Sequence, residues 1–85
     1  MGDQIVWRDL SFVVDQSEPF ILLAQALKSV TAVEEVSVFD IYGGDKLPAG
    51  KKSIGFRIKI RGSGNMKSEE INAVMDQAIA AVEDA

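Results

Sequence analysis

The stretch VSVFDIYGGDKLPAGKKSIGF, from Val36 to Phe56, contains two runs rich in β-branched and aromatic residues. The residues between these runs include Gly43, Gly44, Pro48 and Gly50. Glycine and proline at such spacing are typical of a connection between strands. The stretch therefore predicts a β-hairpin with a long loop, whose second strand opens with the paired lysines Lys51 and Lys52.

The composition of the 85 residues is that of one small globular domain. Hydrophobic residues make up 47% of the chain and charged residues 26%, so we expect a single two-layer core. The lack of cysteine and histidine excludes disulfides, thiolate chemistry and the usual Ser-His-Asp and Cys-His nucleophiles. We therefore expect no cofactor in this chain.

No apolar run approaches the roughly 18 residues of a membrane-spanning helix. The start of the chain also lacks the basic and apolar segments of a signal peptide. These observations predict a cytoplasmic protein with no membrane partner.

The charges are segregated along the chain, although the net charge is only −4. The segment 46–68 holds seven lysines and arginines and no acid, whereas the other residues carry a net charge of −11. A net negative charge argues against binding nucleic acid by bulk electrostatics. A basic hairpin on an otherwise acidic domain still predicts a local binding surface for an anionic partner.

Two segments before the hairpin have clear periodicities. Residues Val6 to Val14 alternate as in a half-buried strand, with Leu10, Phe12 and Val14 on one side and Asp9, Ser11 and Val13 on the other. After a turn at 15–19, a helix ending near Thr31 is predicted. Its apolar stripe consists of Phe20, Leu23, Ala24, Leu27 and Val30.

The strand predicted over Val33 to Tyr42 changes phase in its middle. Val36 and Val38 alternate together, but Phe39 and Ile41 fall in the opposite phase. A β-bulge between Val38 and Phe39 would resolve this by sending Phe39 and Ile41 inward and Asp40 and Tyr42 outward.

The third strand and the second helix complete the pattern. The third strand alternates Ile54, Phe56, Ile58 and Ile60 inward with Ser53, Gly55, Arg57, Lys59 and Arg61 outward. Ser68, as a cap, and the acids Glu69 and Glu70 start the helix, and its apolar stripe is Ile71, Val74, Met75, Ala78 and Val82.

The resulting order, β-α-β-β-α, predicts an α+β ferredoxin-like sandwich that lacks its last strand, with both helices on one face of an antiparallel sheet. The other face is expected to be open. Its lining residues would be Ser11, Asp40, Tyr42, Ser53, Arg57 and Lys59.

Four segments carry a resemblance to a known family. They are RDLSFVVD (8–15), VFDIY (38–42), GKKSIGFR (50–57) and SEEIN (68–72). In this order and at these intervals they resemble the ferredoxin-fold anticodon-binding domain, which closes the beta chain of bacterial phenylalanyl-tRNA synthetase. The resemblance covers nearly the whole of residues 1–85, which we interpret as one such domain. Two departures, the missing Gly-Ala-x-Leu-Arg strand after Ala85 and the missing Phe-Pro before Arg8, suggest an excised fragment.

The resemblance implies a non-catalytic module that docks the anticodon stem-loop of phenylalanine tRNA. Its partners would be that tRNA, the remainder of the beta chain and the alpha chain, while ATP and magnesium serve ligation elsewhere in the enzyme. Asp40 resembles the family's acceptor for the guanine at the first anticodon position, and Tyr42 the ring on which that base stacks. Ser11 and Ser53 match small polar positions beside them.

Alternatives remain for several residues. Lys51, Lys52 and Arg57 are candidates for phosphate contacts, but lysines at a strand entrance are also typical of solvated or protected edges. Trp7 is interpreted as an interface or fragment-end residue. The alternative function is a protein-protein interaction module that uses the sheet face or the unpaired edge of the first strand.

Overall fold

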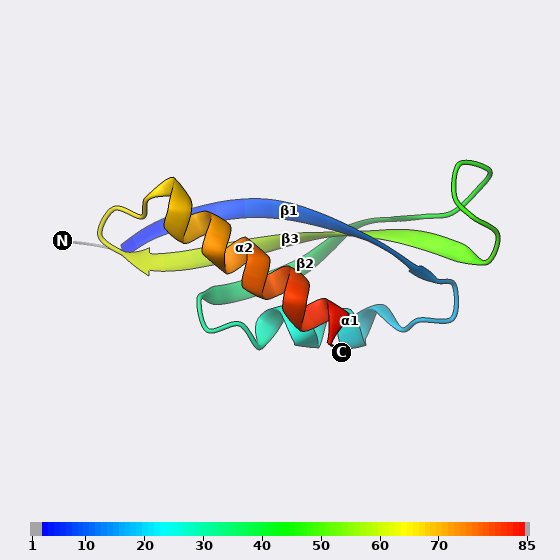
Figure 1. The fold of residues 1–85 in the computed structure, drawn as a ribbon, viewed down its shortest axis with the longest axis horizontal. Coiled ribbons are helices and arrows are strands. Elements are labelled where there is room, and N and C mark those ends of the chain that lie inside the picture. The colour runs from blue at the N-terminus through cyan, green and yellow to red at the C-terminus, as the bar shows by residue number, and fades with distance from the viewer. Residues whose placement is uncertain (1–2, 85) are drawn as a thin grey trace.

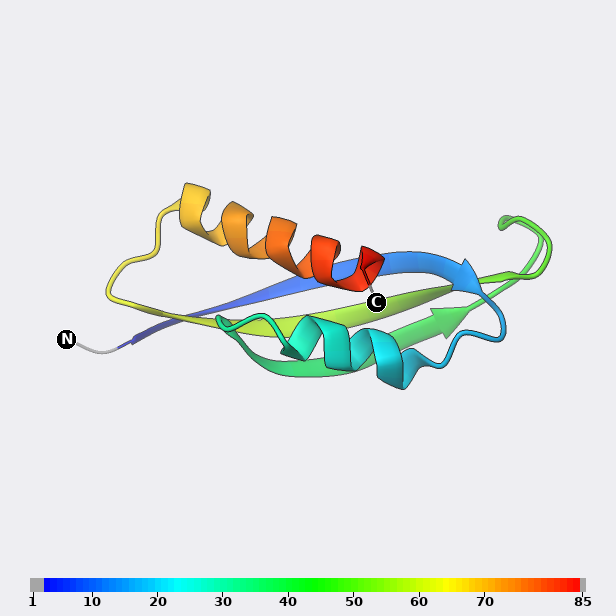
Figure 2. The same ribbon diagram turned by 60° about the horizontal axis from the view of Figure 1, so that its bottom comes forward.

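The computed structural model describes residues 3–84. Its elements are β1 (Asp3–Asp15), α1 (Phe20–Lys28), β2 (Val33–Tyr42), β3 (Lys51–Ser63) and α2 (Ser68–Glu83). The strands form one antiparallel sheet in the order β1-β3-β2, so β3 is the central strand (Figure 1). Both helices pack on the same face of this sheet (Figure 2). The predicted ferredoxin-like α+β order is therefore confirmed.

The core lies between the helices and the inward side of β3. Ile54, Phe56, Ile58 and Ile60 are completely inaccessible to solvent, as the alternation of this strand predicts. The helices contribute Leu23, Leu27, Val74 and Ala78 to the same cluster, among others. Phe12 of β1 adds an aromatic contact, with ring centroids 6.1 Å from Phe56. Each fully buried large side chain contributes about 1.5–3 kcal/mol, so this one layer stabilises the fold.

Several boundaries differ from those predicted. The helix α1 ends at Lys28 instead of near Thr31, and the hydroxyl of Ser29 donates a hydrogen bond to the Ala26 carbonyl at 2.6 Å. Phe20 is 45% exposed and does not join the buried stripe. In α2, Ser68 is the first helical residue and not the cap.

The predicted β-bulge in β2 is confirmed. Val38 pairs with Phe56 and Asp40 pairs with Gly55, so Phe39 is the extra residue. Because directly paired residues share a face, Ile41 lies on the helix side opposite Ile54, and Asp40 and Tyr42 lie on the other side.

The inward orientation predicted for Phe39 is wrong. Its ring lies against Gly55 on the side without helices, and a Cβ atom built on Gly55 would be 2.8 Å from the Cζ of Phe39. Because Gly55 on the central strand has no side chain, it leaves space for the Phe39 ring. The hydrophobic pattern of β2 alone does not reveal this space. Ile41 faces the helix side but is 49% exposed, because the β2-β3 hairpin extends beyond both helices (Figure 1).

The connection between β2 and β3 confirms the long hairpin loop. Gly44 has φ 141° and Gly50 has φ 78°, and this region of backbone conformation favours glycine. The Gly50 carbonyl accepts a hydrogen bond from the Gln16 amide at 2.9 Å, which joins the base of the loop to the end of β1.

Candidate nucleic-acid interface

The sheet face without helices, called here the open face, is organised in rows that cross all three strands. Successive rows along β3 are two residues, or about 6.7 Å, apart. In the order β1, β3, β2, the four rows are Val13-Ser53-Tyr42, Ser11-Gly55-Asp40, Asp9-Arg57-Ser37 and Trp7-Lys59-Glu35. The first two rows bring together four residues that the sequence predicts for the site, Ser11, Asp40, Tyr42 and Ser53.

These four predicted residues are unequally accessible. Ser11 and Asp40 are exposed and flank Gly55, and the Phe39 ring lies over this glycine. Tyr42 is 52% exposed. Ser53 is only 4% exposed, because it lies on the central strand between Val13 and Tyr42, and it lines the open face less than predicted.

The paired lysines point to opposite sides of the sheet. Lys51 lies opposite Asp15, and its ammonium contacts the Asp15 carboxylate at 2.6 Å. This contact lowers the pKa of Asp15. Lys52 lies opposite Val14, on the helix side, and is therefore not part of the open face. Its contact with RNA stays a prediction.

Arg57 links all three strands. Its Nε and Nη2 donate hydrogen bonds to the two carboxylate oxygens of Asp9 at 2.9 and 3.1 Å. These hydrogen bonds are the main cause of the lowered pKa of Asp9. The guanidinium carbon lies 5.2 Å from the centroid of the Phe39 ring, which is within the range of a cation-π contact. Arg57, on β3, thus contacts Asp9 of β1 and Phe39 of β2 at the same time.

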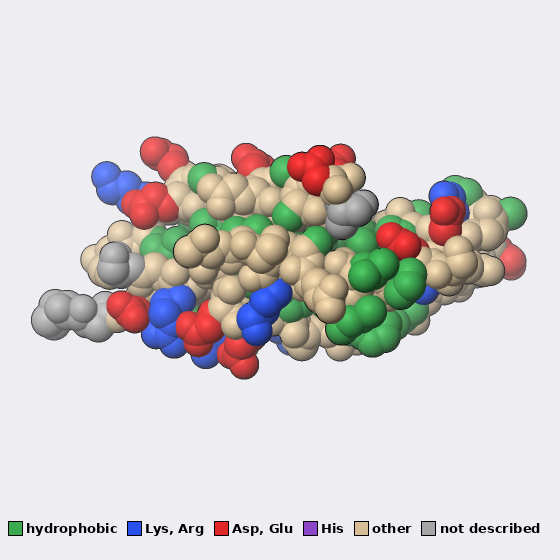
Figure 3. Space-filling view, turned by 90° about the horizontal axis from the view of Figure 1, so that it is seen from below, with side chains coloured by type: hydrophobic (Ala, Val, Ile, Leu, Met, Phe, Trp, Pro, Cys, Tyr) green, Lys and Arg blue, Asp and Glu red, His purple; other side chains and the backbone are tan. Residues whose placement is uncertain are grey.

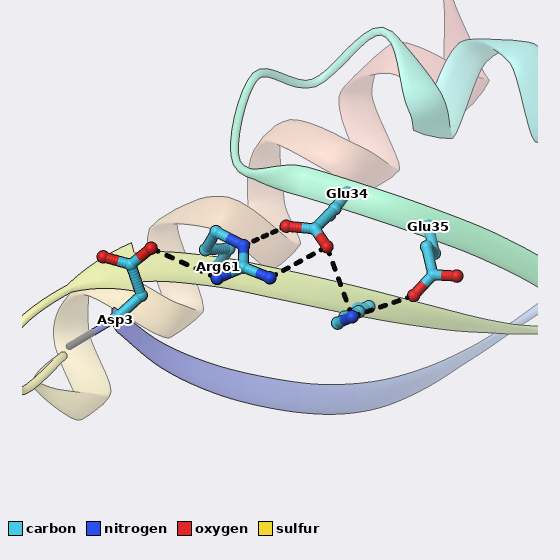
Figure 4. Close-up of polar contacts among 5 residues, drawn as sticks. Asp3, Glu34, Glu35 and Arg61 are labelled. Atoms are coloured by element: carbon cyan, nitrogen blue, oxygen red, sulfur yellow. Dashed lines mark hydrogen bonds and ion pairs between the residues drawn. The ribbon is translucent and has the colours of Figure 1, made fainter.

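A larger ion-pair network lies toward the start of β1. Arg61 contacts Asp3 at 3.1 Å and forms two hydrogen bonds with Glu34 (Figure 4). Lys59 contacts Glu34 at 3.2 Å and Glu35 at 3.0 Å. The hydrogen bonds from Arg61, with help from Lys59 and against the effect of partial burial, lower the pKa of Glu34 to about 2. Figure 3 shows acidic and basic side chains intermingled at this end of the molecule.

The expected basic surface is therefore neutralised to a large extent. Four of the seven cations in segment 46–68, namely Lys51, Arg57, Lys59 and Arg61, form ion pairs with carboxylates of the neighbouring strands. The charges alternate across the strand pairs and not along the chain. The segregation of charge along the sequence therefore predicted a larger basic surface than the folded sheet has. Within residues 3–84, the remaining three cations of the segment, Lys46, Lys52 and Lys67, form no ion pair.

The sequence reasoning missed a hollow near the outer edge of β1. It is lined by Trp7, Arg8, Asp9 and Arg57 and has a volume of about 610 Å³. Trp7 is 50% exposed, and the Lys59 ammonium lies 5.8 Å from its ring centroid. Trp7 shares the phase of Asp9 and Ser11, so strict alternation through β1 already places it on the open face.

Over residues 3–84, no group of three or more acidic side chains is arranged to hold a metal ion. In the same part of the chain, no helix is long and apolar enough to cross a membrane.

The fold and the exposed polar and aromatic side chains of the open face define a ferredoxin-like binding domain. Residues 3–85 match the family model described as "Ferredoxin-fold anticodon binding domain", and the chain belongs to this family. It is similar to the phenylalanine–tRNA ligase beta subunits of Rickettsia prowazekii (38% identical over 93% of this chain), Geobacillus kaustophilus (40% over 92%) and Anaplasma marginale (41% over 93%). In each case the match covers 10% of the relative, so the chain spans about a tenth of the length of these curated proteins.

Proposed function

We propose that this chain is the anticodon-binding domain of a phenylalanine–tRNA ligase beta subunit. In this proposal it docks the anticodon stem-loop of phenylalanine tRNA on its open face. Its protein partners are the remainder of the beta chain and the alpha chain, and ATP and magnesium serve the ligation step in other parts of the enzyme. The observation that carries the proposal is the row Ser11-Gly55-Asp40 beside the half-exposed ring of Tyr42, in a chain that belongs to an anticodon-binding family.

The chemistry of this row suits one splayed base. The ring of Phe39, which lies over Gly55 and is 49% exposed, offers an aromatic surface in this row. The Asp40 carboxylate accepts hydrogen bonds only, which matches the N–H donors on the pairing edge of guanine. Tyr42, two residues along β2, offers a ring for stacking. Ser11, across β3, supplies a hydroxyl that both donates and accepts.

Phosphate contacts on this face require an exchange of partners. Lys51 and Arg57 already hold Asp15 and Asp9, so an RNA phosphate has to replace or share these carboxylates. We assign positioning of the backbone to these two residues, and recognition of the base to Asp40 and Tyr42. Lys52 lies on the helix side and is left out of this assignment.

The test is a titration of the chain with a phenylalanine anticodon stem-loop and with a variant changed at the first anticodon base. Tyr42→Ala removes one stacking ring, which is worth about 1–3 kcal/mol, so affinity should fall about 5-fold to 150-fold. Asp40→Asn should reduce the preference for guanine. Phe20→Leu, which changes a similarly exposed ring on the helix layer, is the matched control. Wild-type affinity and base preference in both site variants would contradict the proposal.

The rival function, a protein-interaction module, is favoured by one observation. Over residues 3–15, β1 forms an outer edge of the sheet, and edge strands pair readily with other chains. Such pairing predicts dimers whose amount rises with protein concentration and survives high salt, whereas RNA binding weakens as salt rises. Sedimentation of the chain at two salt concentrations separates these outcomes.

A further inference from the structure

We propose that the hollow lined by Trp7, Arg8, Asp9 and Arg57 is a second nucleobase subsite, in which a base of the same bound RNA stacks on the Trp7 indole. The inference rests on the proposed function, because it needs an RNA strand on the open face. It adds a contact that the predicted site, centred on Asp40 and Tyr42, does not contain.

The hollow has the size and the wall of a base site. Its volume of about 610 Å³ lies within the range of about 300–1,000 Å³ that is usual for small-ligand sites. Half of the Trp7 surface is accessible, and the Lys59 ammonium lies over its ring. Lys59 is in turn fixed by Glu34 and Glu35 at 3.2 and 3.0 Å. The indole thus has the Lys59 ammonium over its ring, and half of its surface is accessible to a stacking partner.

The polar groups of the hollow suit a nucleotide. Asp9 uses two of the five N–H groups of Arg57, which leaves three donors for a base edge or a phosphate. The guanidinium plane is held in one orientation by this bidentate contact, and RNA bases stack on such planes as well as on aromatic rings. Arg8, which donates a hydrogen bond to the Trp7 carbonyl at 2.9 Å, forms no ion pair within residues 3–84. Its charge is therefore not balanced by a carboxylate of this part of the chain.

The flat side chains connect the two subsites across the sheet. From Tyr42 and Phe39 on β2, the series continues through the Arg57 guanidinium on β3, 5.2 Å from the Phe39 centroid, to Trp7 on β1. Tyr42 lies opposite Ser53 and Trp7 opposite Lys59. Six residues along β3 correspond to about 20 Å, or about six nucleotides stacked at about 3.4 Å each. The base at Trp7 is therefore not a neighbour of the base at Tyr42 along the bound RNA.

The chain carries a built-in reporter for this hollow, since Trp7 is its only tryptophan. Saturation with the anticodon stem-loop should quench or shift the tryptophan emission. Trp7→Leu should lower the affinity about 5-fold to 150-fold, the range for one stacked base, and Trp7→Phe should restore most of it. The affinity ratio between the stem-loop and its first-base variant should stay at the wild-type value in Trp7→Leu, whereas Asp40→Asn should change it. Phe20→Leu again serves as the matched control for loss of an exposed ring.

The results separate this inference from the proposed function. If the stem-loop binds with a preference for its first base, while Trp7 emission is unchanged and Trp7→Leu binds like wild type, the second subsite is refuted and the first stands. Absence of any RNA binding at low salt refutes both. If the Trp7 emission changes as the protein concentration is raised in the absence of RNA, a second protein chain covers the hollow. This result also overturns the inference.

Discussion

Replacing Gly55 by alanine tests whether the row Ser11-Gly55-Asp40 of the open face is where RNA binds. Gly55 pairs with both Ser11 and Asp40, and a Cβ atom there would lie 2.8 Å from the Cζ of Phe39, with the two Cε atoms at 3.1 and 3.2 Å. Ordinary van der Waals contact begins at 3.4 Å, so the tip of the ring has to move by about 0.6 Å or more. The displaced ring also changes the surface between Ser11 and Asp40.

The expected loss of stability is small. Gly→Ala in extended backbone gains about 0.4–1 kcal/mol by restricting the unfolded chain, and crowding of a packed side chain costs about 1–3 kcal/mol. The net loss is therefore between about 0 and 2.5 kcal/mol. We expect the lower half of this range, because Phe39 is 49% exposed and its ring can swing outward. The affinity for the anticodon stem-loop should fall at least about 5-fold, the effect of losing one weakly stacked base.

Urea denaturation measures the stability of the variant, and a stem-loop titration measures its affinity. Gly62→Ala is the matched control, because it changes a glycine on the same strand whose Cβ would overlap with the Sδ of Met66. Gly62 is on the helix side of the sheet, opposite Gln4, so its substitution should reduce stability without affecting RNA affinity. If Gly55→Ala folds and binds the stem-loop as tightly as wild type, the assignment of the base to this row is wrong.

Three other predictions concern charge and packing. Arg61→Gln should raise the pKa of Glu34 from about 2 toward 4.5, which an NMR titration would follow. In the wild-type chain the pKa of Glu34 is lower in the folded state than in the unfolded state, so the ionised carboxylate stabilises the fold above about pH 4.5. This contribution is lost as the pH falls toward 2. An unchanged pKa in that variant would contradict the assigned cause. The logarithm of RNA affinity should fall linearly with the logarithm of salt concentration, with a slope near −2, as for about three phosphate contacts. A slope near −5 would show that all seven cations of segment 46–68 contribute. Leu27→Ala should cost about 2–5 kcal/mol of unfolding free energy, because Leu27 is fully buried, whereas Leu22→Ala at a 48% exposed position should change it by less than about 0.5 kcal/mol.

Local periodicity was sufficient to predict the fold. The alternation of β3 identified its buried face, and the change of phase in β2 located the bulge at Phe39. Both features depend on neighbours in the chain, which a sequence pattern records directly. Phe20 marks the limit of this approach, because helical spacing does not indicate how far the sheet beneath a helix extends.

The candidate site was predicted less completely, because its contacts join distant residues. The orientation of Phe39 depends on Gly55, which is 16 positions away and matters through the side chain it lacks. The pairing of Arg57 with Asp9, 48 positions apart, depends on the register of β1 against β3. A sequence without its register shows a cluster of cations, whereas the folded sheet shows cations and carboxylates in pairs.

The ion pairs of the open face also affect how an RNA would arrive. A surface with unpaired cations attracts every polyanion from a distance and speeds its association, but a surface whose charges are already paired exerts little long-range pull. Under the proposed function, cognate and non-cognate RNAs would then reach this domain at similar rates. Their discrimination would depend on dissociation, that is, on how long a base remains in place once the flat side chains and Asp40 have engaged it.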